Sequence, residues 1–274
     1  MTPDPDVLGD LHSHLVPGVD DGARTVEEAM GALAAFTRAG VRRVLTTPHL
    51  AASVLATPGE ARARLDRVED AFRGLVVAAG SRFPEVTLTL GHEVLLDLPD
   101  PDLSDPRARM AGTRFVLVEW PAMRVPPGTA AVLERVREGG WIPVLAHPER
   151  YRGVAEDRIV STARRWKDAG ALLQLNHGSL AGRHGSEARR RAMALLRSGV
   201  ADYLSSDHHP RPGHDPGVQT SREVFREIEA EESFLVLTRT NPGRLMADQE
   251  PLPVPPVRGD EGLRARISAW LGRH

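Results

Sequence analysis

Short apolar segments alternate with longer amphipathic segments along most of this 274-residue chain, and this alternation restricts the possible folds more than any other feature. The short segments are typical of strands covered on both faces, and the long ones repeat apolar residues at the three- and four-residue spacing of helices. Strands and helices in alternation build parallel βαβ units. The sequence therefore predicts an α/β fold, either an open parallel sheet or a closed barrel. The expected strands are 7–11, 43–46, 87–90, 115–119, 142–146, 172–175 and 202–205.

The segments between these strands predict helices. Thr25 precedes Glu28 by three residues, which is the spacing of a capping box at a helix N-terminus. The sequence contains neither the glycine fingerprint of a dinucleotide site nor a P-loop. The expected helices are 25–39, 58–79, 127–138, 157–169 and 187–198. Helices are also expected to continue through 218–232, with a short closing turn at 241–248.

The chain changes character after Glu250. Residues 1–250 are expected to form one domain, because an α/β barrel of about this length is ordinary. Residues 251–259 are rich in proline and predict an extended linker, and residues 260–274 predict a short amphipathic helix. We expect this helix to pack back on the barrel, with a contact between two copies of the chain as the alternative.

The composition excludes several kinds of chemistry. The chain has no cysteine, so it cannot use a cysteine nucleophile, a thiolate metal site or a disulfide. Its one lysine among 35 lysine and arginine residues is Lys167, which lies in a charged helical segment where a solvated role is expected. The net charge of −2 gives no indication of a nucleic-acid-binding face. Without a signal peptide or an apolar run of about 18 residues, the chain is expected to be cytoplasmic.

Histidine and acidic residues gather where the expected strands end. In a parallel α/β fold, ligands collect at the carboxyl ends of the strands. His12 and His14 follow the first strand at alternate positions, so both rings can point at one metal ion. One such residue alone would be incidental, but six of the seven expected strands end this way. The candidate ligands are His12, His14, Asp21, His49, Glu93, Glu119, His147, Asp207 and His209, with Asp20 interpreted as a turn residue and Asp10 as a support for the histidines.

These candidate ligands offer nitrogen and oxygen atoms without sulfur. Such a set suits Mn²⁺, Fe, Zn²⁺ or Mg²⁺ and does not select one of them. Nine ligands are too many for one ion, so bridging carboxylates could hold two or three. A cluster of this kind polarises a phosphoryl oxygen and lowers the pKa of a water molecule from 15.7 toward about 7. The pattern therefore predicts hydrolysis of a phosphomonoester.

Eight motifs carry a resemblance to a known family. They are Asp-Leu-His-Ser-His-Leu-Val-Pro-Gly-Val-Asp-Asp-Gly at 10–22, Thr-Pro-His at 47–49, Gly-His-Glu at 91–93, Val-Glu-Trp-Pro at 118–121, Ala-His-Pro-Glu-Arg at 146–150, Asn-His-Gly-Ser-Leu-Ala-Gly-Arg-His-Gly at 176–185, Ser-Asp-His-His at 206–209 and Asn-Pro at 241–242. Together they resemble the PHP (polymerase and histidinol phosphatase) family, and within it the bacterial tyrosine phosphatases of capsule and exopolysaccharide synthesis.

This resemblance implies a distorted (β/α)7 TIM-like barrel with three metal ions, for which Mn²⁺ is expected. The nine candidate ligands match its ligand positions, with Glu93 as the bridge. Arg150 matches an arginine whose forked donors suit a phosphate, and Arg211 is a second candidate for that role. The chain differs from the family pattern at the pocket rim, with Leu50 after the Thr-Pro-His motif and His92 where glutamine is common.

The implied substrate is phosphotyrosine on a protein, with a membrane tyrosine kinase of polysaccharide export as the expected partner. Three alternatives stay open. The same chemistry could act on a small phosphomonoester such as histidinol phosphate or a nucleotide. An amidohydrolase-like barrel would need a carbamylated lysine at a strand end, for which Lys167 is badly placed. The barrel could also serve as a non-catalytic scaffold.

Overall fold

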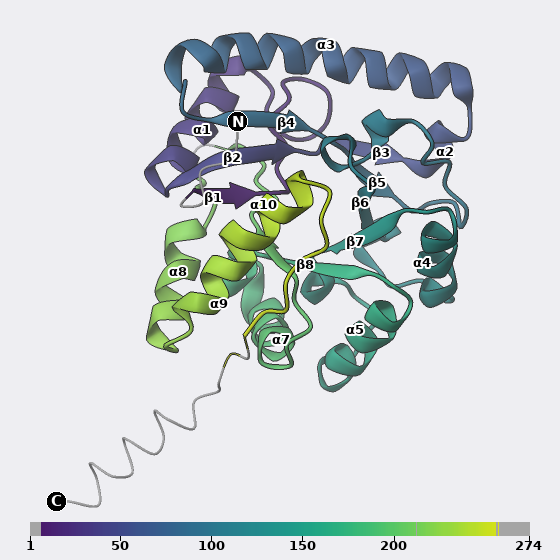
Figure 1. Ribbon diagram of the computed structural model, residues 1–274, viewed down its shortest axis with the longest axis vertical. Coiled ribbons are helices and arrows are strands. Elements are labelled where there is room, and N and C mark those ends of the chain that lie inside the picture. The colour runs from purple at the N-terminus through teal and green to yellow at the C-terminus, as the bar shows by residue number, and fades with distance from the viewer. Residues whose placement is uncertain (1–6, 212, 256, 258–274) are drawn as a thin grey trace, which may run out of the picture.

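In the computed structural model, parallel strands are surrounded by helices (Figure 1). The structure describes residues 7–211, 213–255 and 257. The strands make a three-stranded sheet of order β1-β2-β4 and a six-stranded sheet of order β3-β5-β6-β7-β8-β9, and every pairing is parallel. The predicted α/β fold with parallel strands is confirmed. The strands are β1 (Leu8–Asp10), β2 (Val41–Thr46), β3 (His49–Ala51), β4 (Thr87–Leu90), β5 (Glu93–Leu95), β6 (Phe115–Glu119), β7 (Ile142–Ala146), β8 (Leu172–Asn176) and β9 (Tyr203–Ser205).

Two strands of the barrel are each broken in the middle. Residues 47–48 separate β2 from β3, and residues 91–92 separate β4 from β5. Each pair is one barrel strand, because the pairing register passes the break unchanged. The prediction that His49 and Glu93 end their strands is therefore wrong, since both open the second part. Pro48 has no N–H to donate, which favours an interruption at this point.

The barrel closes where the chain leaves β9 and β1. An isolated parallel bridge joins Ser13 to His208. Around it, the Asp207 N–H donates to the His12 carbonyl (2.8 Å) and the His14 N–H donates to the His208 carbonyl (3.0 Å). The first and last strands thus meet through the segments that carry predicted ligands, and the seven-stranded barrel is complete.

Helices follow most strands and cover the outside of the barrel (Figure 1). Thr25 accepts a hydrogen bond from the Glu28 N–H (3.2 Å), so half of the predicted capping box forms, while the Glu28 carboxylate accepts from the Arg24 N–H. The segment 218–232, for which helices are expected, contains one helix and the start of a second, with Glu229 between them at φ +53°. The α-helices are α1 (Val26–Arg38), α2 (Ala52–Leu55), α3 (Pro58–Arg82), α4 (Thr129–Glu138), α5 (Ile159–Asp168), α6 (His177–Leu180), α7 (Gly185–Arg197), α8 (Val218–Glu227), α9 (Glu231–Leu235) and α10 (Asn241–Met246).

A core of aliphatic and aromatic side chains fills the barrel below the carboxyl ends of the strands. Leu11, Leu117, Val144 and Tyr203 from four strand regions pack with Leu245 of α10, and all are buried. Figure 1 shows α10 crossing beside β1. Helix α10 therefore covers the amino ends of the strands and leaves the carboxyl ends open to ligands.

The proline-rich segment after α10 lies against the barrel domain. The Asn241 side chain exchanges hydrogen bonds of 2.8 and 3.0 Å with the Leu252 backbone, and Val257 is 2% exposed. The expected helix 260–274 lies outside the described residues, so the predicted domain limits stay predictions. Among the residues the structure describes, no helix is long and apolar enough to cross a membrane.

Candidate metal centre

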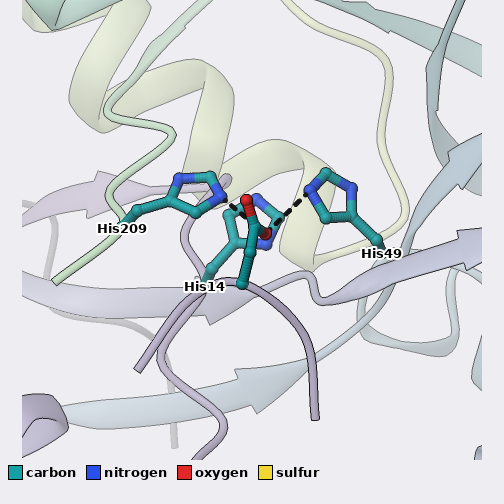
Figure 2. Close-up of side chains that lie close together, drawn as sticks. His14, His49 and His209 are labelled. Carbon is teal, nitrogen blue, oxygen red and sulfur yellow. Dashed lines mark hydrogen bonds and ion pairs between the residues drawn. The ribbon is translucent and has the colours of Figure 1, made fainter. Parts of the chain in front are cut away.

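Eight predicted ligands form three overlapping groups at the carboxyl ends of the strands, and the ninth adjoins them. His147, which follows β7, places Nε2 3.0 Å from Glu93 Oε1. Figure 2 shows the rings of His14, His49 and His209 gathered around a carboxylate. The three groups are His12, His14, Glu93 and Asp207; His14, Asp21, His49 and His209; and His49, Glu93 and Glu119.

The first group has the spacing of atoms that share one ion. His12 Nε2 lies 3.1 Å from Glu93 Oε2, 3.3 Å from Asp207 Oδ1 and 3.3 Å from His14 Nε2. His14 Nε2 lies 3.4 Å from the Glu93 oxygen and 3.3 Å from the Asp207 oxygen. Ligand atoms about 2.1 Å from an ion lie about 3.0 to 3.4 Å from one another in octahedral or tetrahedral geometry. The donor set therefore fits a metal ion.

The second group is more open to solvent. Asp21 Oδ1 lies 3.3 Å from His49 Nε2 and 3.2 Å from His209 Nε2. The His209 ring stacks on the His14 ring at a centroid distance of 4.0 Å. The Asp21 side chain is 67% exposed, so this part of the cluster is the part that an incoming substrate reaches first.

Glu93 connects the groups. Its Oε2 is buried without a hydrogen-bond partner and also lies 3.1 Å from His49 Nδ1, which is 3.4 Å from Glu119 Oε1. Burial acts to raise the pKa of Glu93, but His12, His14 and His147 hold this pKa well below its usual range. A buried, ionised carboxylate oxygen surrounded by imidazole nitrogens has the chemistry of a ligand shared between metal ions.

Asp20 orients His14, a role that the sequence interpretation as a turn residue missed. Asp20 Oδ2 lies 2.8 Å from His14 Nδ1 and also accepts from the His49 N–H (3.1 Å). Burial opposes a charged His14, but Asp20, Asp207 and Glu93 together raise the pKa of this histidine well above its usual value. A carboxylate on one ring nitrogen directs the other nitrogen to a metal. The sequence signal for this role was the position of Asp20, directly before the predicted ligand Asp21.

Gln174 orients His12 from β8 and was also missed. Its Oε1 lies 2.8 Å from His12 Nδ1, and its Nε2 donates to Asn176 Oδ1 at 2.9 Å. Both amides are fully buried. The sequence did contain a signal, because the expected strand 172–175 is the one that ends in no ligand, and the amides Gln174 and Asn176 stand two residues apart at its end.

Asp10 fastens the first strand to the last. Its carboxylate accepts from the His12 N–H (3.2 Å) and the Ser206 N–H (2.8 Å). Burial raises the pKa of Asp10 to about 7, although these contacts act to lower it. The structure thus places Asp10 where the sequence expected a support for the histidines.

The two predicted arginines lie at the rim and contact the ligand segments. Arg150 Nη1 donates to Asp207 Oδ2. The Arg211 guanidinium donates to the carbonyls of Asp21, Gly22 and Pro210. Each arginine therefore holds a segment that carries a ligand.

A cavity of about 550 Å³ opens beside the cluster. The residues that line it include the predicted ligands Asp207 and His209, together with Arg150 and His184. Burial lowers the pKa of His184 to about 4, so its imidazole is neutral near neutral pH. A second cavity of about 670 Å³ shares Arg150 and His184 with the first. The first cavity thus adjoins the metal centre through Asp207 and His209, and the second cavity adjoins the first.

The sequence model of the capsular polysaccharide synthesis family CpsB/CapC matches residues 8–247. The tyrosine-protein phosphatase YwqE of Bacillus subtilis (strain 168) is 29% identical over 208 residues, which cover 73% of this chain and 76% of that protein. The tyrosine-protein phosphatase CpsB of Streptococcus pneumoniae is 27% identical over 251 residues, which cover 88% of this chain and 98% of that protein.

Solved structures share the fold. A crystal structure from work on YwqE and CpsB, described there as unique metal-dependent tyrosine phosphatases, superposes with a TM-score of 0.72 at 24% identity and covers 92% of this chain and 99% of that one. The phosphotriesterase homology protein of Escherichia coli, complexed with phosphate, superposes with a TM-score of 0.53 at 13% identity and covers 88% and 98%. Because the family model spans most of the chain, this protein belongs to the capsular polysaccharide synthesis family CpsB/CapC.

Proposed function

We propose that this chain is a metal-dependent phosphatase that removes phosphate from phosphotyrosine on proteins. The observation that carries the proposal is the set of three overlapping ligand groups, with Glu93 in two of them and ligand atoms 3.1 to 3.4 Å apart in the first. Membership of the CpsB/CapC family and two tyrosine-protein phosphatases among the relatives support the phosphotyrosine substrate.

The residues would hold two or three ions, and Mn²⁺ is the expected metal. When bound, such ions polarise a phosphoryl oxygen and lower the pKa of an attacking water. The protein residues then have separate tasks. Asp20 and Gln174 keep the ring nitrogens of His14 and His12 directed at the cluster. Since the chain has no cysteine, a cysteine nucleophile cannot substitute for this site.

Arg150 is proposed to contact the phosphoryl group. One of its nitrogens donates to Asp207, while the residue also lines the cavity beside the metal centre and the cavity that adjoins it. A guanidinium in that place can stabilise the negative charge that develops on the phosphoryl oxygens. Arg211 is proposed for the same task, in addition to its contacts with the Asp21 segment.

The adjoining cavities favour a protein substrate over a small one. The cavity of about 550 Å³ can take the tyrosine ring, and the neighbouring one of about 670 Å³ can take chain on one side of it. We propose that the substrate is a tyrosine kinase of capsule or exopolysaccharide synthesis, which agrees with the family description.

A substrate panel tests the function. Purified protein is loaded with Mn²⁺ and given phosphotyrosyl peptides, histidinol phosphate and nucleoside monophosphates, and phosphate release is measured. We expect the highest kcat/KM on the peptides and no release by the His12→Ala or Asp207→Ala variants, which should remain folded. A preference for a small ester would reassign the substrate, and full turnover by either variant would refute the metal mechanism.

A further inference from the structure

Strand β8 is the exception among the barrel strands, because its end supplies no predicted metal ligand. Instead it carries Gln174 and Asn176 at alternate positions, so both side chains lie on the same face of the strand. Both are 0% exposed. Two buried amides at the level of a metal centre need partners for all their polar atoms, and those partners show what the strand does.

The hydrogen bonds of Gln174 fix which way its amide points. Nε2 donates to the Leu175 carbonyl (2.6 Å) and to Asn176 Oδ1 (2.9 Å). A flipped amide would place its oxygen against these two acceptors, so Oε1 must face His12 Nδ1, 2.8 Å away. Because Oε1 can only accept, His12 must carry its proton on Nδ1. This leaves the Nε2 lone pair of His12 directed at the metal centre.

Asn176 in turn determines which carboxylate oxygen of Asp207 faces the metal centre. Its Oδ1 is used by Gln174, so its Nδ2 is the donor that lies 3.2 Å from Asp207 Oδ2. Arg150 donates to this same carboxylate oxygen. The other oxygen, Oδ1, is therefore left for the cluster, where it lies 3.3 Å from His12 Nε2. His12, Gln174, Asn176 and Asp207 are thus linked by a chain of three hydrogen bonds, which leaves two acceptor atoms, His12 Nε2 and Asp207 Oδ1, for the metal centre.

We propose that Gln174 and Asn176 are positioning residues that set the His12 tautomer and select the metal-binding oxygen of Asp207. Both amide hydrogens of Gln174 and the proton on His12 Nδ1 meet an acceptor, so the proton arrangement of this chain of hydrogen bonds is fixed before a metal binds. The two amides act on ligands from β1 and β9, which flank the seam where the barrel closes. Strand β8 thereby stabilises the first ligand group without ligating a metal.

The neutral charge of these amides distinguishes His12 from His14. His14 Nδ1 faces the carboxylate of Asp20, whereas His12 Nδ1 faces an uncharged amide oxygen. The two neighbouring histidines therefore have unequal basicity, because a carboxylate partner raises the basicity of an imidazole ligand more than an amide does. This proposal rests on the metal centre of the proposed function, but not on the identity of the phosphate ester.

Metal affinity tests the proposal without reference to turnover. Mn²⁺ and Zn²⁺ are titrated separately into metal-free protein in competition with a chromophoric chelator. Gln174→Leu removes both halves of the amide, and Asn176→Asp removes its donor while keeping its shape. Supporting residues of this kind contribute about 10- to 100-fold in metal affinity, so each variant should lose that factor. Gln174→Glu keeps an acceptor toward His12 and should bind metal more tightly than Gln174→Leu.

Asn241→Asp is the matched control. Asn241 is equally buried and donates to the carbonyls of Asp202 and Leu252, away from the ligands. This variant should unfold at lower temperature with unchanged metal affinity. The proposal is overturned if Asn176→Asp keeps metal affinity within twofold of wild type, or if Asn241→Asp loses as much. If the wild type binds metals but releases no phosphate from phosphotyrosyl peptides, the proposed function is wrong. The positioning role of Gln174 and Asn176 is not affected by that result, because it is measured by metal affinity.

Discussion

Glu93 is the residue on which the metal centre depends most. It belongs to two of the three ligand groups, is 1% exposed, and has a carboxylate oxygen without a hydrogen-bond partner. His12 and His14 after β1 and His147 after β7 hold its pKa low against the effect of burial. A single carboxylate thus joins ligands that are far apart in the sequence.

Replacing Glu93 by glutamine should remove the shared ligand while keeping its shape. We expect metal content to fall and phosphate release to drop at least about 100-fold, since a ligand contributes more than a supporting residue. Elemental analysis and initial rates measure the two effects. Glu134→Gln, an exposed position on α4, is the control and should change neither. Wild-type metal content in Glu93→Gln would argue against a bridging role.

A variant of Arg211 can distinguish between two roles of this side chain, which are support of the Asp21 segment and contact with the phosphoryl group. Its guanidinium contacts the Asp21 and Gly22 carbonyls, so Arg211→Ala should loosen Asp21 and weaken metal binding by the second ligand group about tenfold. If contact with the phosphoryl group is its main task, KM should rise while metal affinity stays unchanged. Chelator competition and steady-state kinetics on the same preparation separate the two results.

At the scale of elements, the breaks in the second and third barrel strands decide where ligands lie. After each break the strand resumes with a ligand, His49 in β3 and Glu93 in β5, and these two residues pair across the sheet. Gly91 at the second break approaches Met110 so closely that an added Cβ would lie 2.9 Å from its Cα. The interruption therefore brings the end of the barrel strand against a neighbouring segment and directs the two ligands inward.

The turn that carries Asp21 needs glycine at its next position. A Cβ added at Gly22 would lie 2.2 Å from the His14 carbonyl oxygen. Gly22→Ala should therefore displace Asp21 and His14 and reduce phosphate release at least about tenfold. Gly31→Ala in α1 is the control, because a Cβ there meets nothing within 4 Å. That change should raise stability by about 0.5–1 kcal/mol with unchanged rate. Equal activity of the two variants would contradict this role of the turn.

The sequence predicted the alternation of elements well, because hydrophobic periodicity is local information. It missed β3 and β5, since strands of three residues are too short to show a pattern. The nine candidate ligands could be named because strand ends converge in a parallel fold. Asp20 and Gln174 could not be assigned, because their roles depend on which histidine lies opposite, and only the packed barrel decides that.

At the scale of the whole molecule, several histidines outside the ligand set are buried and neutral. Burial lowers the pKa of His177 to about 3 and that of His92 to about 4. His177 Nδ1 lies 2.6 Å from Ser221 Oγ, which itself donates to the Val218 carbonyl, so the histidine is the donor. Burial, followed by the charge of Arg183, disfavours a second proton on this ring. The folded state therefore resists protonation at these positions.

Stability should consequently fall as the solution is acidified. The unfolded chain binds a proton at His177 below about pH 6.5, and the folded chain does so only near pH 3, so stability is present above pH 6.5 and is lost between these values. From pH 7 to pH 5.5, this residue alone should reduce the free energy of unfolding by about 1.2 kcal/mol. Urea unfolding of wild type and His177→Gln at both pH values measures it. An identical pH dependence in both would contradict the assignment.

The central claim is that a cluster of metal ions held by the strand ends carries out the hydrolysis. The most direct measurement is the rate of phosphate release from a phosphotyrosyl peptide as Mn²⁺ is added back to metal-stripped protein. The account predicts no release without metal and a saturating rise complete at two or three equivalents of bound ion. Full release by the stripped protein in the presence of a chelator would contradict it.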